Sequence, residues 1–280
     1  MPPSIAQQIE RQQVPSGTVA IWWLGQNSYV LQGPSTLIII DPFFSRTRPA
    51  ENFLHQASPL RADELGPDAV LCTHNHSDHT DPAFLSDLSQ HWPATRFFGP
   101  PESAREMIAS GVPADRVGVL QPGDEVRIAE ALVQVVLSKT AEVSDVAHYG
   151  YLVQIGGGPK VYNTGDIMRG ATREPALMEP LRRAAPAVAL ITTSPTEEEF
   201  PDFAEAALLV REIGAQVAIP AHYDCFTRRT FDPAGFAAQF PEGSAPRPVI
   251  IPYCGVYRYP ESPSASETAA LWEPGPPGDV

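Results

Sequence analysis

Short apolar segments rich in β-branched residues follow one another along most of the chain, and they limit the possible fold more than any other feature. Four come first, at 19–24, 29–31, 36–40 and 69–73. Ten more follow, at 96–98, 117–120, 125–128, 132–137, 151–155, 161–163, 188–192, 217–219, 249–251 and 256–259. Apolar runs of this length, separated by Gly, Pro, Asn or Asp, predict β-strands.

Helical patterns are fewer and come later. The best candidates are 101–110, 175–184, 203–213 and 233–239, and Pro at or near the first turn is compatible with a helix start. Strands followed by helices interspersed with further strands favour an α/β fold with two sheets and helices packed outside, rather than a barrel.

The length and composition suit one large folded unit. With 280 residues, of which 43% are hydrophobic, the chain can bury a full core. We expect a single domain over 1–262. Residues 263–280 are rich in Pro, Ser and Gly, which predicts a C-terminal tail without a packed core.

Charge and cysteine content argue against several classes of protein. The chain has 33 acidic residues against 19 Lys and Arg, a net charge of −14, and this field repels nucleic-acid phosphates. Its three cysteines, Cys72, Cys225 and Cys254, form no Cys-x-x-Cys pair, so neither a disulfide framework nor a thiolate zinc site is indicated. A reducing cytoplasm fits this pattern best.

The apolar segments also argue against export and membrane insertion. Residues 1–17 are polar and lack the basic and apolar segments of a secretory signal. Runs such as 37–40 and 132–137 fall far short of the roughly 20 residues that cross a bilayer. We therefore expect a cytoplasmic protein with no membrane partner.

The most informative stretch is Thr73-His74-Asn75-His76-Ser77-Asp78-His79-Thr80-Asp81, which directly follows an apolar strand. Histidines two apart at a strand end point to one side, while the following turn can aim Asp78 and His79 at a neighbouring point. This arrangement suits two adjacent metal ions. Imidazole and carboxylate ligands suit Zn, Fe or Mn and do not choose among them. The alternative is a polar surface loop, which would not require four ligand-type residues in register.

Three residues at other strand ends are candidates for further ligands, because a sheet brings distant strand ends to one edge. Asp166 follows a strand through Gly165, which lets its carboxylate approach and bridge two ions; a turn aspartate is the alternative. His222 also sits where a strand ends, with the same alternative of a structural role. His148 precedes the strand 151–155, and it could be either a ligand or a bystander.

The remaining histidines and one aspartate have other predicted roles. His55 and His91 lie in polar or Pro-containing loops and are expected at the surface. Asp41 ends an apolar run and could hold a metal-bound imidazole from behind, as carboxylates commonly do. A simple turn aspartate is the alternative.

The His-x-His-x-Asp-His pattern, with the later Gly165-Asp166 and His222, resembles the metallo-β-lactamase superfamily. Within it, the chain from about 12 to 260 is similar to the L-ascorbate 6-phosphate lactonase branch, in the segments 16–25, 68–81, 121–124, 163–166 and 219–224. The chain departs from that branch in a shorter linker over 43–65, in Asn163 where the lactonase has a histidine, and in Ile167 where it has a small polar residue.

The resemblance implies a four-layer αββα sandwich, the metallo-β-lactamase fold, with one or two divalent ions, Mn, Zn or Fe, at one edge of the sheets. It also implies hydrolysis of a lactone or other carboxylic ester in a small, sugar-phosphate-like substrate through a metal-bound hydroxide. Asp78 is the expected proton acceptor as well as a ligand. Tyr149 and Tyr223 could donate to the oxyanion, or simply pack. Asp224 is a candidate to hold a ligand or contact the substrate.

Alternatives stay open on the same scaffold. A phosphodiesterase is one, and a metal-binding module without turnover is another. A phosphorylated substrate would need nearby cations, and Arg46, Arg48, Arg169 and Arg173 lie in loops that could reach the site, although solvated surface arginines are the alternative. A homo-oligomer is expected by analogy only.

Overall fold

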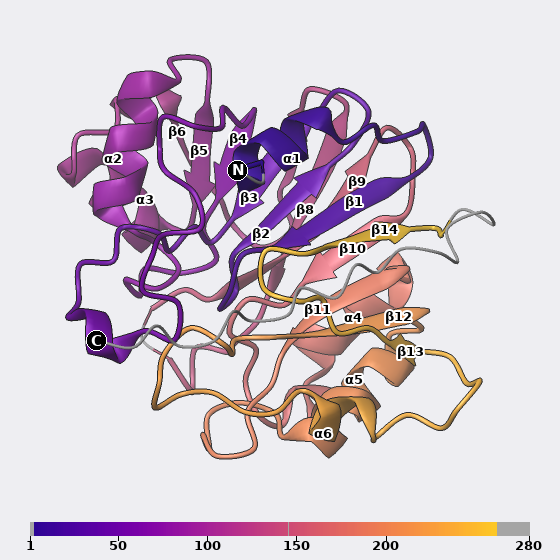
Figure 1. The fold of residues 1–280 in the computed structure, drawn as a ribbon. Coiled ribbons are helices and arrows are strands. Elements are labelled where there is room, and N and C mark those ends of the chain that lie inside the picture. The colour runs from indigo at the N-terminus through magenta and orange to yellow at the C-terminus, as the bar shows by residue number, and fades with distance from the viewer. Residues whose placement is uncertain (1–2, 145, 262–280) are drawn as a thin grey trace, which may run out of the picture.

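The computed structural model describes residues 3–144 and 146–261 and contains two mixed β-sheets packed face to face (Figure 1). The proposed tail at 263–280 lies outside the described residues. Helices cover the outer faces, so the predicted sandwich of two sheets with helices outside is confirmed.

The first sheet has the strand order β14-β1-β2-β3-β4-β5-β6. The strands β14, β1, β2 and β3 pair antiparallel, and β3 to β6 pair parallel. Their bounds are β1 Val19–Trp23, β2 Tyr29–Gln32, β3 Leu37–Ile40, β4 Ala69–Leu71, β5 Arg96–Gly99, β6 Val117–Val119 and β14 Val256–Tyr259.

The second sheet has the order β13-β12-β11-β10-β9-β8-β7. Here β10 to β13 pair parallel, whereas β7, β8, β9 and β10 pair antiparallel. Their bounds are β7 Glu125–Ile128, β8 Ala131–Leu137, β9 Tyr149–Ile155, β10 Lys160–Asn163, β11 Val188–Thr192, β12 Val217–Ala221 and β13 Arg247–Pro248.

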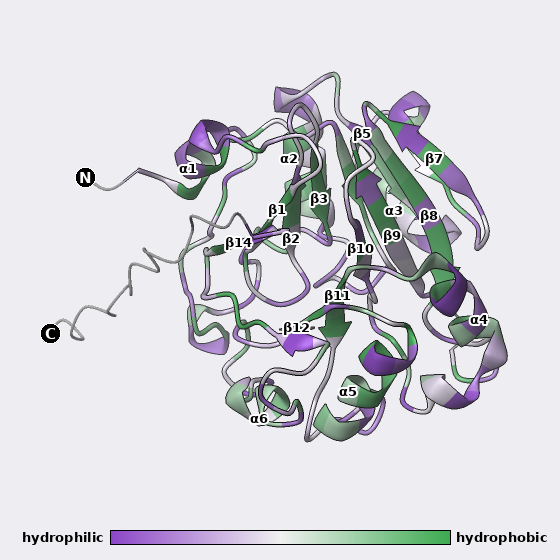
Figure 2. Cartoon of the chain, turned by 90° about the vertical axis from the view of Figure 1, so that its right-hand side faces the viewer, coloured by the Kyte–Doolittle hydropathy of each residue, from purple (hydrophilic) through white to green (hydrophobic). Residues whose placement is uncertain are grey.

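Alternation along the strands builds three buried layers. In β1, Val19, Ile21 and Trp23 face the core between the sheets, while Ala20 and Trp22 face the outer layer. This is the two-residue period of a strand that is buried on both faces. The strand segments in Figure 2 are accordingly mostly green.

Helices complete the outer layers. The first sheet carries α1 Ile5–Arg11, α2 Pro82–His91 and α3 Pro101–Ala109, and the second carries α4 Pro175–Ala184, α5 Phe203–Glu212 and α6 Ala234–Ala237. Short 3₁₀ turns lie at Ala50–Asn52, Ala114–Arg116 and Ala171–Arg173. Helices such as α4 and α5 mix purple and green residues in Figure 2, as expected for helices with one buried face.

Three sequence expectations need correction. The sequence analysis missed α1, which Ser4 starts with a capping box, and α2, which Asp81 caps and Pro82 opens. The strand expected at 249–251 is wrong, because the pairing with β12 uses Arg247 and Pro248 instead. The helix expected at 233–239 shortens to the single turn of α6.

Two further findings concern cysteines and membranes. The three cysteines, Cys72, Cys225 and Cys254, are free thiols in the structure. Among the described residues, no helix is long and apolar enough to cross a membrane.

The topology gathers several strand ends at one edge of the sandwich. Parallel strands β3 and β4 end there, as do β10 and β12. The antiparallel strands β2 and β9 begin at the same edge, since each runs opposite to its neighbour. Side chains that follow or precede these strands therefore converge.

A buried hydrogen bond links the two sheets beside this edge. Tyr151 of β9 donates from Oη to the carbonyl oxygen of Cys72, which follows β4, over 2.6 Å. We expect Tyr151→Phe to lower the free energy of unfolding by about 1–3 kcal/mol, because the buried carbonyl loses this donor. Tyr162→Phe is the matched control, since the Tyr162 hydroxyl is buried and has no hydrogen-bond partner among the described residues. Urea denaturation of both variants measures the difference; equal effects would contradict the assignment.

Candidate metal centre

The structure brings together all seven side chains proposed as metal ligands. His74, His76, Asp78 and His79 lie in the loop after β4, His148 precedes β9, Asp166 follows β10, and His222 follows β12. They form three overlapping groups, and within each group the ligand-type atoms lie within 4.8 Å of one another. Residues far apart in the sequence, such as His74 and His222, thus meet at one edge.

The first group consists of three histidines, His74, His76 and His148. The His74 Nε2 atom lies 3.0 Å from His76 Nδ1, and the rings of His74 and His148 stack with centroids 4.1 Å apart. Because β9 begins at Tyr149, two residues earlier than predicted, His148 is held directly at the strand start. His76 is exposed, so this group is open to solvent on one side.

The second group consists of Asp78, His79 and His222. Asp78 Oδ2 lies 3.9 Å from Nε2 of His79 and 3.9 Å from Nε2 of His222. His79 and His222 are buried, whereas Asp78 is partly exposed. Asp78 therefore stands between this group and solvent.

Asp166 forms the third group with His74 and His79. It lies between the other two groups and offers one oxygen to each. Its Oδ2 is 3.5 Å from His74 Nε2, and its Oδ1 is 3.4 Å from Nε2 of both His79 and His222. Among the described residues, neither Asp166 Oδ1 nor His79 Nε2 makes a hydrogen bond, although both are buried. Two ligands about 2.1 Å from one ion lie about 3.0 Å apart at right angles and about 3.4 Å apart at the tetrahedral angle, so these separations fit a divalent ion.

Electrostatics favour the metal-binding form of most of these groups. Burial alone would raise the pKa of Asp166, but His79 and His222 outweigh it and lower that pKa to about 2. Burial, and then the charge of Lys139, lowers the pKa of His148 to about 3. Ionised carboxylates and neutral imidazoles are the forms that bind metals, and both are present here at neutral pH.

The pKa of His79 is shifted in the opposite direction to that of His148. Burial alone would lower the pKa of His79, but the carboxylates of Asp166, Asp41 and Asp78 raise it to about 10. In the absence of a cation, a proton on this imidazole offsets part of the charge of the three surrounding carboxylates. A divalent ion held here would supply positive charge in place of that proton.

Asp41 holds His79 from the side opposite to the cluster. Its Oδ2 lies 2.7 Å from His79 Nδ1 and accepts hydrogen bonds from Thr73 Oγ1, at 2.7 Å, and Asn27 Nδ2, at 2.6 Å. Its Oδ1 accepts from the Thr73 backbone N–H at 2.7 Å, and the residue is fully buried. This geometry leaves Nε2 of His79 facing Asp166, as a carboxylate that orients a ligating imidazole would.

A tight turn delivers Asp166. Gly165 has φ +52, and its N–H donates to Asn163 Oδ1 at 2.8 Å. A Cβ at Gly165 would lie 2.5 Å from the Tyr149 carbonyl oxygen and 2.9 Å from Thr73 Cβ. Because glycine has no side chain, the turn can pass between the two sheets here.

The aromatic and acidic residues proposed around the site have mixed placements. Tyr149 and Tyr223 are buried in the core between the sheets, and Tyr223 stacks on Trp23 with ring centroids 4.6 Å apart. This placement agrees with the packing alternative for both residues. Asp224 pairs with His55 over 3.1 Å.

The two histidines expected at the surface have different settings in the structure. His55 is half-buried and stacks on Tyr253 with ring centroids 3.6 Å apart, so its expected surface setting is only partly right. His91 is exposed, but it ends α2 instead of lying in a loop, and it pairs with Asp87 one turn earlier.

The sequence analysis missed two residues at this edge. Gln26, in the turn between β1 and β2, reaches Asp78 and His222. Lys139, just after β8, is buried over the Phe200 ring, which lies 4.8 Å from the ring of His222. The end of β8 lies beside the start of β9, so strand pairing could have identified Lys139; no sequence signal marked Gln26.

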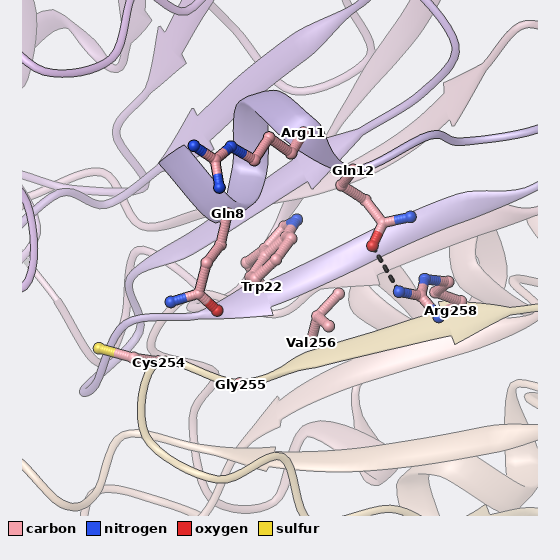
Figure 3. Close-up of a pocket in the computed structure, with 8 residues that line it drawn as sticks. All are labelled: Gln8, Arg11, Gln12, Trp22, Cys254, Gly255, Val256 and Arg258. Carbon is pink, nitrogen blue, oxygen red and sulfur yellow. Dashed lines mark hydrogen bonds between the residues drawn. The ribbon is translucent and has the colours of Figure 1, made fainter. Parts of the chain in front are cut away.

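A surface hollow away from the clustered ligands is lined by residues of other kinds. It lies by α1, β1 and β14 and is lined by Gln8, Arg11, Gln12, Trp22, Cys254, Gly255, Val256 and Arg258 (Figure 3). None of the clustered histidines or aspartates lines this hollow, so it is separate from the metal-binding chemistry of the strand-end edge.

The role assigned to Asp41 predicts a selective loss. Asp41→Asn should weaken metal binding about 10–100-fold, because Asn cannot accept from His79, Thr73 and Asn27 as the carboxylate does. Asp81→Asn is the control, since Asp81 is also buried and accepts three backbone hydrogen bonds, from Phe44, Ser45 and Phe84. Metal content after dialysis should fall only in the Asp41 variant. Equal retention in both would contradict the role.

The turn at Gly165 gives a second prediction. Gly165→Ala should cost more stability than Gly157→Ala and should also lower metal content, because the new Cβ displaces Asp166. Gly157 has φ +68, but no atom lies within 4 Å of the place its Cβ would take, so its variant carries only the backbone strain of about 1–2 kcal/mol. Thermal unfolding and elemental analysis compare the two; similar behaviour would refute the steric argument.

Comparisons with known proteins agree with a metal-binding role for this site. Residues 36–223, which contain all seven clustered side chains, match the Beta-lactamase superfamily domain. A metal-dependent hydrolase from Symbiobacterium thermophilum is 27% identical over 241 residues, covering 82% of this chain and 96% of that protein. A probable L-ascorbate-6-phosphate lactonase from Salmonella heidelberg is 26% identical over 205 residues, and that match spans only 57% of each protein.

A solved structure shows the same fold. Igni18, a metallo hydrolase from the archaeon Ignicoccus hospitalis, superposes with a TM-score of 0.69 at 19% identity, covering 88% of this chain and 100% of that one. At this identity the likeness concerns the fold alone. The family match, the paired sheets and the His/Asp cluster agree, and the protein belongs to the metallo-β-lactamase superfamily as a metal-dependent hydrolase.

Proposed function

We propose that the protein hydrolyses the ester bond of a lactone, or of another carboxylic ester, in a small anionic substrate. The observation that carries the hydrolytic part is the division of the Asp166 carboxylate between two ligand groups, one oxygen facing each. The lactone is favoured because several relatives, at 26–27% identity, are named probable L-ascorbate-6-phosphate lactonases.

The proposed cofactor is one or two divalent ions, Mn or Zn, with Fe compatible with the same ligands. His74, His76 and His148 would hold one ion, Asp78, His79 and His222 the other, and Asp166 would bridge them. Bound ions supply a nucleophile from water near neutral pH and stabilise negative charge on the substrate oxygen.

Asp78 is the residue we assign to proton transfer. Burial alone would raise its pKa, but His79 and His222 lower it below the ordinary value, so the carboxylate is ionised at neutral pH. It is also the partly exposed member of its group. It can therefore accept a proton at the solvent side of the cluster and pass it to the leaving alcohol.

One arginine lies in a position to recognise an anionic group on the substrate. Arg48 donates from Nη2 to Ser77 Oγ, 3.1 Å away, between the ligands His76 and Asp78. Arg46 instead donates to backbone carbonyls of His55 and Phe43.

The other two proposed arginines have different surroundings. Arg169 donates to the Phe200 carbonyl and lies near Asp202 and Glu205, and Arg173 lines a hollow with Arg169 away from the clustered ligands. Arg48 is thus the best candidate of the four.

The first experiment measures metal and activity together. Purified wild-type protein should contain one to two equivalents of Mn, Zn or Fe and hydrolyse members of a lactone panel. A His76→Ala, His79→Ala double variant should lose the metal, and its activity should fall more than about 100-fold. Losing a ligand has a larger effect than losing a residue that only hydrogen-bonds to a ligand.

His91→Ala is the control, because His91 is exposed at the end of α2, where it pairs with Asp87 and belongs to none of the ligand groups. Activity on a phosphodiester panel without activity on lactones would favour the phosphodiesterase instead. Wild-type protein that takes up no metal after reconstitution would refute the proposed cofactor.

A further inference from the structure

Gln26 is a buried residue whose position is fixed by the backbone around it. It is 1% exposed and has φ 54, an unusual value for a residue other than glycine. Its N–H donates to the Tyr223 carbonyl at 3.0 Å, and its own carbonyl accepts from the His222 N–H at 3.0 Å. Trp23 Nε1 donates to the same carbonyl at 3.0 Å. The turn between β1 and β2 is thus clamped to the loop that carries His222.

The side chain of Gln26 points at the second ligand group. The atom placed as Nε2 lies 2.9 Å from Asp78 Oδ2 and 2.9 Å from His222 Nε2. Its Oε1 is buried without a hydrogen-bond partner among the described residues. The oxygen and nitrogen of an amide exchange places by a rotation of 180°, and the neighbouring atoms decide between the two orientations.

The spacing is that of neighbouring ligands on one ion. Two ligands about 2.1 Å from an octahedral ion, at right angles, lie about 3.0 Å apart. The Gln26 amide atom has this spacing to Asp78 and to His222. When both of these face a cation, an N–H₂ group between them would meet the cation with its positive end, whereas the amide oxygen would meet it with a lone pair.

We propose that Gln26 supplies its amide oxygen as a further ligand to the ion held by Asp78, His79 and His222. This inference rests on the proposed metal binding. With Asp166, this ion then has three oxygen and two nitrogen ligands from the protein. Oxygen-rich sites of high coordination number suit Mn²⁺ better than Zn²⁺, which favours four ligands.

The rival role for Gln26 is a hydrogen-bond donor that merely positions Asp78. Two substitutions separate the roles. Gln26→Glu keeps an oxygen at the same place but cannot donate, while Gln26→Met keeps the length and volume and removes both polar atoms. If Gln26 is an oxygen ligand, Gln26→Glu keeps the ligand and Gln26→Met removes it. If Gln26 is a hydrogen-bond donor, both variants remove the donor.

The test is a Mn²⁺ titration of metal-free protein, followed by electron paramagnetic resonance of free Mn²⁺ and by elemental analysis. We expect one of the bound equivalents to weaken at least about tenfold in Gln26→Met, while Gln26→Glu binds as tightly as wild type or more tightly. Equal weakening in both variants, or no weakening in Gln26→Met, would overturn the proposal. Wild-type protein that binds no metal would instead refute the proposed function.

Gln32→Met is the matched control, because the Gln32 amide bonds to Trp22 and to the Ile9 carbonyl, away from the cluster. Its Mn²⁺ affinity should equal that of wild type. If Gln26→Met does not fold, as judged by circular dichroism, Gln26→Asn keeps the amide but is one methylene too short to reach. It should show the same weakening, and unchanged Mn²⁺ binding would overturn the proposal.

Discussion

The buried carboxylate of Asp41 is the interaction on which the metal centre depends most directly. It receives hydrogen bonds from Thr73 twice and from Asn27, and it contacts His79 Nδ1. Asp41 itself follows β3, and these partners come from the β1–β2 turn and the loop after β4. An ionised carboxylate without water is costly unless it is fully hydrogen-bonded, so its partners cannot move independently. The loop that carries the ligands is fixed for the same reason.

The second constraint is charge. The carboxylates of Asp41, Asp78 and Asp166 surround His79 and raise the pKa of its imidazole. In the metal-free protein the proton on this imidazole therefore offsets part of their negative charge. Asp166 in turn has a lowered pKa because His79 and His222 face it. The site is therefore built for added positive charge. Divalent ions between the carboxylates and imidazoles would satisfy buried atoms that the described side chains leave without hydrogen bonds.

Much of the fold and the ligand set could be predicted from local patterns. The spacing in the stretch 73–81 predicted four of the clustered side chains, and strand ends predicted Asp166 and His222. The prediction was weaker where the signal was short or depended on distant partners. The α2 helix was missed despite its Asp81-Pro82 start, and strand 249–251 was placed too late because β13 is set by pairing with β12.

The sequence by itself determined the apolar strands and the ligand types, since alternation and chemical identity are local properties. Only the tertiary structure decided which of these residues meet. His148 joins His74 because β9 runs antiparallel to β10, and Gln26 reaches Asp78 because the β1–β2 turn is bonded to the loop of His222. Such contacts depend on strand direction and on long-range backbone hydrogen bonds, which residue spacing along the chain does not encode.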